Sequence, residues 1–476
     1  MPHRALDRAV HHAKQFLAAQ DSRSVAATAS RETLLERFDV MLPHDGISAE
    51  VVLDELAANA EGGLLGNVGG RFFAWVIGGV LPAAHAAEWL TVTWDQNAAI
   101  YATSPAASVI EEVAGKWLLS VLRLPPDASF AFTTGCQMAH FTALLAARDH
   151  LMRLRGWDVN RQGLAGGPRA RVIASEIRHV SVDRALRFLG IGADQVIALP
   201  AEHGGSISAS QLGTALDSVD DSPCLVLLNA GDLNVGAFDR FRDLIPRVHE
   251  RGGWVHVDGA FGLFARTSSR FAELTDGMDL ADSWATDCHK WLNVPQDCGF
   301  AAVRHREAHR RAMTIHDSYF VAEESARDQI DWSPEWSRRA RGISVYAALR
   351  QLGRSGVAAL IERNCDQCAT LVTEIAALPG VQCIAPAQLN QGLVRFLDAR
   401  PGATDQDHDA RTDAVIAAIN RSGEAFFGGV RWRGQRAMRI SVVNWQTRPD
   451  DIRRTVDAVR HALHAEPVAG DSASDR

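Results

Sequence analysis

Two stretches decide the fold: WVHVDGAFG at residues 254–262 and ATDCHKWLNVPQDCGF at residues 285–300. In the first, a short β-prone run leads directly to Asp258, and a glycine and an alanine follow. In the second, a strand-like run leads to Lys290, and an apolar segment containing a proline follows. Strands that end in polar side chains and glycine turns are typical of the carboxyl edge of an α/β sheet, where such folds place their sites.

The same pattern continues on both sides of these stretches. From about residue 90 to 350, short apolar runs alternate with longer amphipathic runs typical of helices, such as 137–154 and 241–252. This alternation predicts a large doubly wound α/β domain with a mainly parallel sheet. The expected strands are SFAFTT (129–134), RVIAS (171–175), QVIALP (195–200), CLVLLNA (224–230), WVHVD (254–258) and CGFAAV (298–303).

The two ends of the chain differ from this middle part. The runs at 5–19 and 48–60 have helical spacing and predict an N-terminal helical arm. From residue 351 a helix leads into two strand-like runs and a last helix, which predicts a small α+β domain reaching residue 464. The remaining stretch, 465–476, has the composition of a disordered tail.

Composition excludes several classes of protein. With 476 residues, of which 47% are hydrophobic and 22% charged, the chain can bury a large core. A net charge of -8 without basic blocks makes nucleic acid an unexpected partner. No run approaches the roughly 20 apolar residues that span a bilayer, and the first residues lack a signal peptide's apolar core, so we expect a cytoplasmic protein without membrane contact.

The seven cysteines are scattered and odd in number, which indicates reduced thiols rather than a disulfide framework. Cys365 and Cys368 form a C-x-x-C pair, but no second pair of ligands follows. A zinc site needs about four ligands, so we predict no metal.

The chain contains only three lysines. Lys14 and Lys116 lie on amphipathic runs, where an ammonium group is solvated. Lys290 stands beside Trp291 and Leu292, and partial burial there would lower its pKa. An amine of lowered pKa forms a Schiff base with an aldehyde at neutral pH, so Lys290 is the candidate nucleophile.

Three further features fall at the ends of predicted strands. Gly135 begins the turn Gly135-Cys136-Gln137, whose backbone N–H groups could bind phosphate at a helix start, although such a junction is more often plain turn chemistry. His179 follows a strand and could stack on a flat ring or merely start a helix. Asp258 could face a pyridinium nitrogen or cap a helix.

In this order, the phosphate turn, the histidine, H-V-D-G-A and D-C-H-K-W-L-N-V-P resemble the group II pyridoxal-5′-phosphate (PLP) dependent amino-acid decarboxylases, which act on aromatic amino acids, glutamate, histidine and tyrosine. The resemblance covers about residues 60–460 and includes GRFFAWVIGGVLPAAHAAEWL at 70–90. It implies the PLP-dependent transferase fold, called fold type I. The implied domains are an arm and substrate-entry segment (1–90), a PLP-binding domain (91–350) and a C-terminal domain (351–464).

The resemblance also implies roles around the cofactor ring. Lys290 would carry PLP as a Schiff base, and Asp258 would pair with the pyridine nitrogen. Ala260 would pack under the ring, and His179 would stack on its other face and could move a proton. These side chains would direct the electrons of the breaking Cα–carboxylate bond into the cofactor, releasing CO2 and an amine.

At the phosphate end, the resemblance implies that His289 contacts the phosphate and that Gly135, Cys136 and Gln137 hold it through backbone N–H groups. Gln137 stands where relatives often have serine or threonine. Asp232 and Asn234 lie in a loop that borders the cofactor in relatives, and no role is assigned to them.

The sequence departs from mammalian relatives in the mobile loop. These place a tyrosine late in that loop, but ESARDQIDWSPEWSRR at 324–339 has none. Tyr319 is the only tyrosine of the loop and is a catalytic candidate. The late tyrosine is associated with protonating the carbanion, so its absence leaves open an oxygen-consuming, aldehyde-forming reaction in place of simple decarboxylation. An aminotransferase and a non-catalytic PLP-binding protein are two further hypotheses.

The substrate is less constrained than the reaction. Phe72, Phe73 and Trp75 fall in the stretch that resembles the family's aromatic pocket wall, which favours an aromatic amino acid, but ordinary core packing explains them equally. Relatives form the site across a twofold dimer, so the resemblance implies a homodimer.

Overall fold

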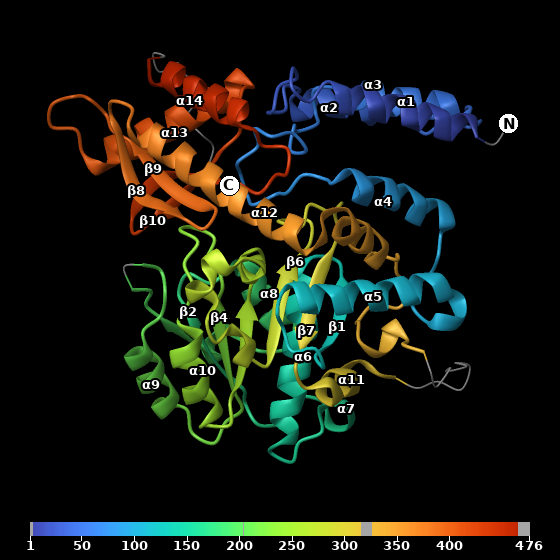
Figure 1. The fold of residues 1–476 in the computed structure, drawn as a ribbon, viewed down its shortest axis with the longest axis vertical. Helices are drawn as coiled ribbons and strands as arrows, with labels where there is room; N and C mark the ends of the chain where they lie inside the picture. The colour runs from blue at the N-terminus through green and yellow to red at the C-terminus, as the bar shows by residue number, and fades with distance from the viewer. Residues whose placement is uncertain (1–2, 203, 316–325, 465–476) are drawn as a thin grey trace. The chain divides into compact units, whose positions relative to one another are not determined.

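The computed structural model describes residues 3–202, 204–315 and 326–464 (Figure 1). The chain divides into two compact units. One comprises Met1–Ile77, Thr370–Ile384 and Leu393–Arg476, and the other comprises Gly78–Ala369 and Ala385–Gly392. We call them the small unit and the large unit.

The large unit is built on a seven-stranded sheet in the order β1-β7-β6-β5-β4-β2-β3. Strands β3, β2, β4, β5 and β6 pair in parallel, whereas β7 is antiparallel to both β6 and β1. The strands are β1 (Ser129–Thr133), β2 (Arg171–Ser175), β3 (Val196–Leu199), β4 (Cys224–Asn229), β5 (Trp254–Asp258), β6 (Ser283–Asp287) and β7 (Gly299–Val303).

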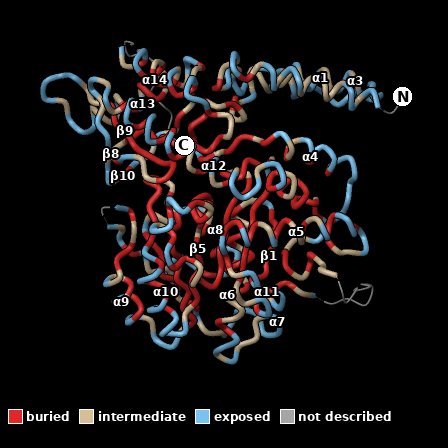
Figure 2. The backbone as a smooth tube through the Cα atoms, viewed as in Figure 1, coloured by how far each residue is buried: buried red, intermediate tan, exposed pale blue. Residues whose placement is uncertain are grey.

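The sheet carries the core of this unit because its strands are short, apolar and covered on both faces. Every residue of β1, β4, β6 and β7 is buried, and β5 is buried up to Asp258 (Figure 2). Near-continuous apolar strands of this kind are typical of sheets that helices cover on both sides. Helix α6 packs against β1, β5, β6 and β7, and α10 packs against β5.

The helices of the large unit lie mainly between successive strands. They are α4 (Pro82–Trp94), α5 (Pro105–Val121), α6 (Cys136–Arg153), α7 (Val159–Gln162), α8 (Val180–Phe188), α9 (Ala209–Ser218), α10 (Phe241–His249) and α11 (Arg306–Met313). Short 3₁₀ turns are η1 (Tyr101–Thr103), η2 (Ala193–Gln195), η3 (Gly262–Thr267), η4 (Ser269–Phe271), η5 (Glu273–Thr275), η6 (Met278–Leu280) and η7 (Gln329–Asp331). Helix α12 (Gly342–Ala376) continues into the small unit and is kinked at Gly353, which has φ 63°.

The small unit contains the N-terminal helices α1 (Arg4–Ala18), α2 (Arg31–Phe38) and α3 (Ala49–Ala60). Its second part holds helices α13 (Asp405–Ser422) and α14 (Pro449–His464) and most of a four-stranded sheet in the order β10-β11-β9-β8, of which residues 385–388 and 391–392 are counted with the large unit. The strands of this sheet are β8 (Val381–Gln388), β9 (Gln391–Phe396), β10 (Gly428–Trp432) and β11 (Gln435–Ser441).

The predicted α/β fold of type I, with a mainly parallel sheet, is confirmed, and all six expected strands form. Helices α1, α3, α6, α10 and α14 also match the predicted runs. The strand-like run before Lys290 is β6, although it was not among the six listed strands. Strands β8 and β10 were not predicted, because they mix polar and small residues and therefore carry a weak apolar signal. Among the described helices, none has the length and apolar character that crossing a membrane requires.

Candidate active site

The candidate site lies at one edge of the large unit's sheet. Because β7 is antiparallel to both of its neighbours, β1 runs in the same direction as β2, β4, β5 and β6. The carboxyl ends of these strands therefore share one edge. The predicted residues of the phosphate turn, His179, Asp258 and Lys290 follow the ends of β1, β2, β5 and β6, respectively.

Asp258 is the last residue of β5, and its side chain is 12% exposed, so a ligand can reach the carboxylate. Its Oδ1 accepts the backbone N–H of Ala260 at 3.1 Å. Burial alone would raise its pKa, but the neighbouring His140, Lys290 and His179 and the Ala260 N–H outweigh burial, and the pKa falls below its usual value. The group is thus a carboxylate at neutral pH and lies within electrostatic reach of two predicted site residues.

Lys290 follows β6 in a tight turn. The backbone N–H of Lys290 donates to Asp287 O at 3.3 Å. The residue is half-buried, and its Nζ lies 5.9 Å from the centroid of the Phe261 ring. Gly78 packs directly against this turn. A Cβ at position 78 would lie 1.9 Å from the Lys290 carbonyl oxygen. The two stretches of chain can approach this closely only because residue 78 is glycine.

Lys14 and Lys116 lie elsewhere, as predicted. Both are exposed, on α1 and α5, and Lys116 pairs with Glu112 one turn earlier on its helix. Lys290 is therefore the lysine that lies at the carboxyl edge of the sheet.

The phosphate turn forms the N-terminus of α6. Gly135 is the N-cap residue with φ 83°, a conformation that favours glycine, and its carbonyl packs closely on Gly299. The backbone N–H of Cys136 donates to Asp287 Oδ2 at 3.0 Å. An anionic oxygen thus lies at this helix start, as the helix dipole favours. Gln137, the next residue of the turn, is half-buried.

His289 lies beside the same carboxylate, with its Nδ1 2.7 Å from Asp287 Oδ1. Asp287 therefore connects the start of α6 to the residue that precedes Lys290. Asp287 was not predicted as a site residue, although it stands in the lysine motif. The available signal was the carboxylate three residues before the lysine, at the end of a strand.

His179 is the N-cap of α8: its Nδ1 accepts the backbone N–H of Ser181 at 3.2 Å and lies 2.6 Å from Ser181 Oγ. His179 therefore does start a helix, as one of the two interpretations of the sequence expected. Its charge also lowers the pKa of Asp258, so it belongs to the same electrostatic cluster.

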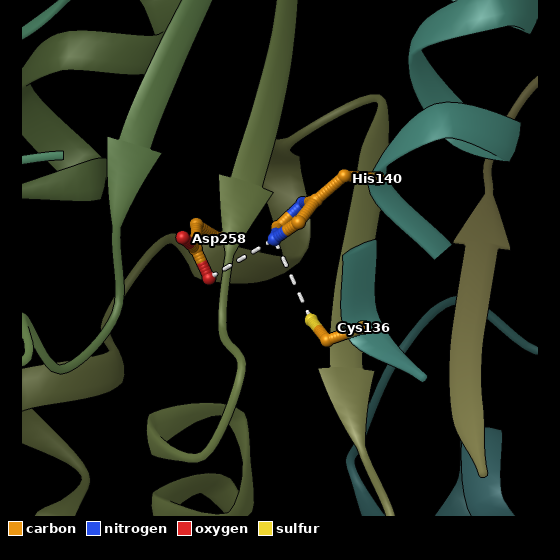
Figure 3. Close-up of side chains that lie close together, drawn as sticks. All are labelled: Cys136, His140 and Asp258. Carbon is orange, nitrogen blue, oxygen red and sulfur yellow. Dashed lines mark hydrogen bonds and ion pairs between the residues drawn. The ribbon is translucent and has the colours of Figure 1, made fainter. Parts of the chain in front are cut away.

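Behind Asp258 lies a second cluster that was not predicted from the sequence. Figure 3 shows Cys136 at the start of α6, His140 one turn further on, and Asp258 at the end of β5. His140 Nε2 lies 3.5 Å from Cys136 Sγ and 3.5 Å from Asp258 Oδ1. His140 is fully buried, and burial lowers its pKa, so the imidazole is neutral.

The other residues named from the sequence are distributed as follows. Tyr319 lies outside the described residues. Asp232 is buried and accepts the backbone N–H groups of Asn234 and Ala237 at 2.8 and 2.7 Å, so it shapes its own loop.

The aromatic stretch lies in the small unit. Phe72 stacks on Phe426 at 5.2 Å between ring centroids, and Phe73 stacks on Phe427 at 5.3 Å. Both rings are buried, which favours core packing for them, whereas Trp75 is 53% exposed.

Comparison with known proteins identifies the family that shares these features. Residues 32–397 match the model described as the pyridoxal-dependent decarboxylase conserved domain. The chain is 24% identical to an aromatic-L-amino-acid decarboxylase of Bacillus atrophaeus over 94% of this chain and 92% of that protein. It is 29% identical to an L-2,4-diaminobutyrate decarboxylase of Rhizobium meliloti (strain 1021) over 79% of this chain and 74% of that protein.

A solved structure extends the similarity to the fold. The crystal structure of Oryza sativa TDC with PLP and tryptamine superposes with a TM-score of 0.89, at 20% identity, and 96% of each chain is covered.

Proposed function

Since the chain belongs to the pyridoxal-dependent decarboxylase family, and is thereby a PLP-dependent carboxy-lyase acting on an amino acid, we propose that its substrate is an aromatic L-amino acid and that Lys290 holds the cofactor. The family match favours decarboxylation over amino transfer and over cofactor binding without turnover. A 4-hydroxyphenylacetaldehyde synthase of Rhodiola rosea is also a relative, so a test of function must separate decarboxylation from aldehyde formation.

One observation carries the assignment of the site. Asp258, an ionised carboxylate with its side chain 12% exposed, shares its electrostatic environment with the amine of Lys290 and the imidazole of His179. These three residues come from three different strand ends, so the sheet alone brings them together. A carboxylate, an amine and an imidazole at one edge are the groups that a pyridinium aldehyde requires.

The donor set fits PLP at the ring end: Asp258 would hold the ring nitrogen protonated, and Lys290 would bind the aldehyde carbon covalently. At the start of α6 two of the three predicted phosphate donors are occupied, because the N–H of Gly135 donates to Thr133 O at 2.9 Å and that of Cys136 donates to Asp287 Oδ2 at 3.0 Å. The phosphate would then be held at this helix start by the N–H of Gln137, with His289 adjacent to it. When bound, PLP supplies the electron-withdrawing ring that accepts the electrons left by the departing carboxylate.

The remaining predicted roles belong to the ring faces. Ala260 is half-buried and packs against Cys136 and Ala285, which supports its place under one face. His179, on the loop after β2, would cover the other face and present its imidazole to the substrate. With the N-cap bond occupying Nδ1, Nε2 is the nitrogen that would move a proton.

The aromatic substrate rests on one observation: the relative that matches 94% of this chain is an aromatic-L-amino-acid decarboxylase. Because the diaminobutyrate decarboxylase has the higher identity, at 29%, a test of substrate must include that amino acid.

We also propose that the protein is a homodimer. Helices α1, α2 and α3 bury no residue. In a monomer their apolar side chains would be exposed to water, whereas a second copy of the chain could cover them. The exposed apolar side chains are Leu6, Leu17, Leu35, Phe38, Val51, Val52 and Leu56. Light scattering after size exclusion should give twice the 51.7 kDa of the chain, and a value of 51.7 kDa would refute the dimer.

The function is tested by supplying the PLP-loaded protein with tyrosine, tryptophan, phenylalanine, 2,4-diaminobutyrate, histidine and glutamate in parallel. Amine, CO2, oxygen uptake and hydrogen peroxide are measured for each. We expect CO2 and amine in equal amounts from an aromatic substrate without oxygen uptake, and none from the Lys290→Ala variant.

Three results would contradict this proposal in different ways. Turnover of 2,4-diaminobutyrate alone would replace the substrate and keep the reaction. Oxygen uptake with peroxide and aldehyde would replace the reaction. Absence of CO2 from every amino acid, with PLP bound, would remove the enzymatic assignment.

A further inference from the structure

A chain of polar side chains runs from the back of Asp258 into the core of the large unit. His140 Nδ1 lies 2.9 Å from His256 Nε2, and His256 Nδ1 lies 2.9 Å from Ser283 Oγ. The chain ends at Trp254, whose indole N–H donates to Ser283 Oγ at 2.9 Å. It joins one residue of α6 to residues of β5 and β6.

All members of this chain are removed from water. His140, His256 and Ser283 are 0% exposed, and Trp254 is 2% exposed. Burial lowers the pKa of both histidines, that of His256 well below its usual value. Two neutral imidazoles in contact must each act as donor at one nitrogen and acceptor at the other.

The end of the chain determines the direction of its hydrogen bonds. The indole N–H of Trp254 can only donate, so Ser283 Oγ accepts it and keeps a second lone pair. If that lone pair also accepted from His256, the buried hydroxyl proton of Ser283 would have no acceptor among its described side-chain contacts, which is costly. Donation of this proton to His256 Nδ1 satisfies it and leaves the proton of His256 on Nε2, facing His140 Nδ1. His140 consequently carries its proton on Nε2, 3.5 Å from Asp258 Oδ1.

If the hydrogen bonds of the chain ran in the opposite direction, the lone pair of His140 Nε2 would face the Asp258 carboxylate. Two electron-rich atoms would then face each other in a buried site, which is costly. Cys136 Sγ is the other group near His140 Nε2, and burial raises its thiol pKa well above the usual value, so it stays neutral. The ionised carboxylate is therefore the stronger acceptor for this proton.

We propose that Trp254, Ser283, His256 and His140 form a one-way hydrogen-bond chain that holds Asp258 ionised and fixes the direction of its carboxylate. This inference rests on the proposed role of Asp258 toward the ring nitrogen of PLP. His140 and His256 are positioning residues, because they act on the cofactor through Asp258. The charged groups facing Asp258 are Lys290 and His179 on the open side, while His140 supports it from the buried side.

The test follows the protonation of the cofactor and needs no turnover. Apoprotein is loaded with PLP labelled with ¹⁵N in the ring, and the ring-nitrogen chemical shift is recorded across the neutral and mildly alkaline range. In the wild type the nitrogen should remain protonated throughout. In His140→Leu and His256→Leu its deprotonation should move into this range, and the dissociation constant of PLP should rise roughly tenfold.

A matched control separates this role from packing. His309 is also 0% exposed and makes two buried contacts, with Ser129 Oγ at 2.9 Å and Trp332 O at 2.8 Å. His309→Leu should lower thermal stability and leave the ring-nitrogen signal unchanged. His140→Gln, which keeps an N–H donor near Nε2, should recover part of the wild-type signal.

The outcomes distinguish the chain from the proposed function. If Asp258→Asn leaves the ring nitrogen unchanged, the role of Asp258 itself is wrong. If Asp258→Asn changes it while both leucine variants titrate as the wild type and bind PLP within about twofold, the hydrogen-bond chain is refuted. Should the leucine variants not fold, Ser283→Ala, which keeps both rings, should shift the titration in the same direction by less; no shift in that folded variant would also refute the chain.

Discussion

Two aspartates of the large unit each contact histidines, at opposite ends of neighbouring strands. Asp258 ends β5 at the carboxyl edge of the sheet, whereas Asp282 immediately precedes β6 at the other edge. Asp282 Oδ2 lies 3.0 Å from His249 Nε2, and its Oδ1 lies 2.9 Å from His305 Nε2. Asp258 lies 3.5 Å from His140, and the second histidine of that cluster stands behind the first.

The difference is between a carboxylate whose two oxygens are both paired with histidines and one that is paired with a histidine through a single oxygen. At Asp282 both oxygens are paired, the backbone N–H of Val255 donates to Oδ2 at 2.7 Å, and the two histidine side chains are 38% and 40% exposed. At Asp258 the histidines are fully buried in series, and the carboxylate keeps 12% of its side chain exposed and is influenced by the charge of Lys290. We therefore expect Asp282 to stabilise the fold and Asp258 to act on the cofactor.

The largest effect should come from Asp258→Asn. Neutralising this carboxylate removes the partner of the ring nitrogen, so turnover should fall at least about a hundredfold, with a small change in unfolding temperature. Steady-state kinetics and thermal unfolding of the same sample measure both quantities. A variant that unfolds at a much lower temperature yet retains its turnover when folded would reverse the comparison.

Asp282→Asn should give the opposite pattern. The hydrogen bonds from His249, His305 and Val255 outweigh burial and lower the pKa of Asp282 from 3.8 to about 2. Its contribution to stability is present above the unfolded pKa and is lost as pH falls through the folded value, because the unfolded state binds the proton first. The substitution should cost about 2 kcal/mol at neutral pH, and most of this cost should be gone near pH 2.

Denaturant unfolding of wild type and Asp282→Asn at several pH values checks this dependence. The gap between the two curves should narrow in acid, and turnover per folded molecule should stay unchanged. A gap that is constant with pH would show that the carboxylate charge is not what Asp282 contributes.

Gly78→Ala tests how much turnover depends on the position of the lysine turn at the carboxyl edge of the sheet. The added Cβ would meet the Lys290 carbonyl oxygen at 1.9 Å, so the lysine turn must move, and turnover should fall about tenfold with weaker PLP binding. Gly213→Ala in α9 is the matched control, because its added Cβ would meet nothing within 4 Å apart from its chain neighbours and the backbone of its own helix. Equal kinetics for the two variants would mean that the lysine turn tolerates displacement.

The smallest effect should follow His305→Gln. This side chain is 40% exposed and shares Asp282 with His249, so its loss should cost only about 0.5 kcal/mol of stability. Thermal unfolding at low and high salt measures it. A loss as large as that of Asp282→Asn would indicate that His305, rather than the paired carboxylate, organises this edge.

Much of the architecture could be predicted from local patterns. The runs RVIAS and WVHVD are short and apolar and end at polar residues, so their strands and the place of Asp258 follow directly. Strand β6 has the composition SWATD and gives little apolar signal, although its register beside β5 sets the position of Lys290.

The hydrogen-bond chain could not be predicted in the same way. His256 lies two residues before Asp258 on its strand, and His140 lies four residues after Cys136 on its helix, which are local signals. That these two rings meet at 2.9 Å depends on the packing of α6 against β5, over a separation of 116 residues. Sequence spacing does not encode contacts of this kind.

The site as a whole depends on one amine, at position 290, holding the cofactor opposite Asp258. Borohydride reduction of the PLP-loaded protein followed by peptide mass spectrometry locates that amine, and only three lysines exist to be modified. We predict a pyridoxyl adduct on Lys290 in the wild type. An adduct on Lys14 or Lys116 instead, with Lys290 unmodified, would contradict it.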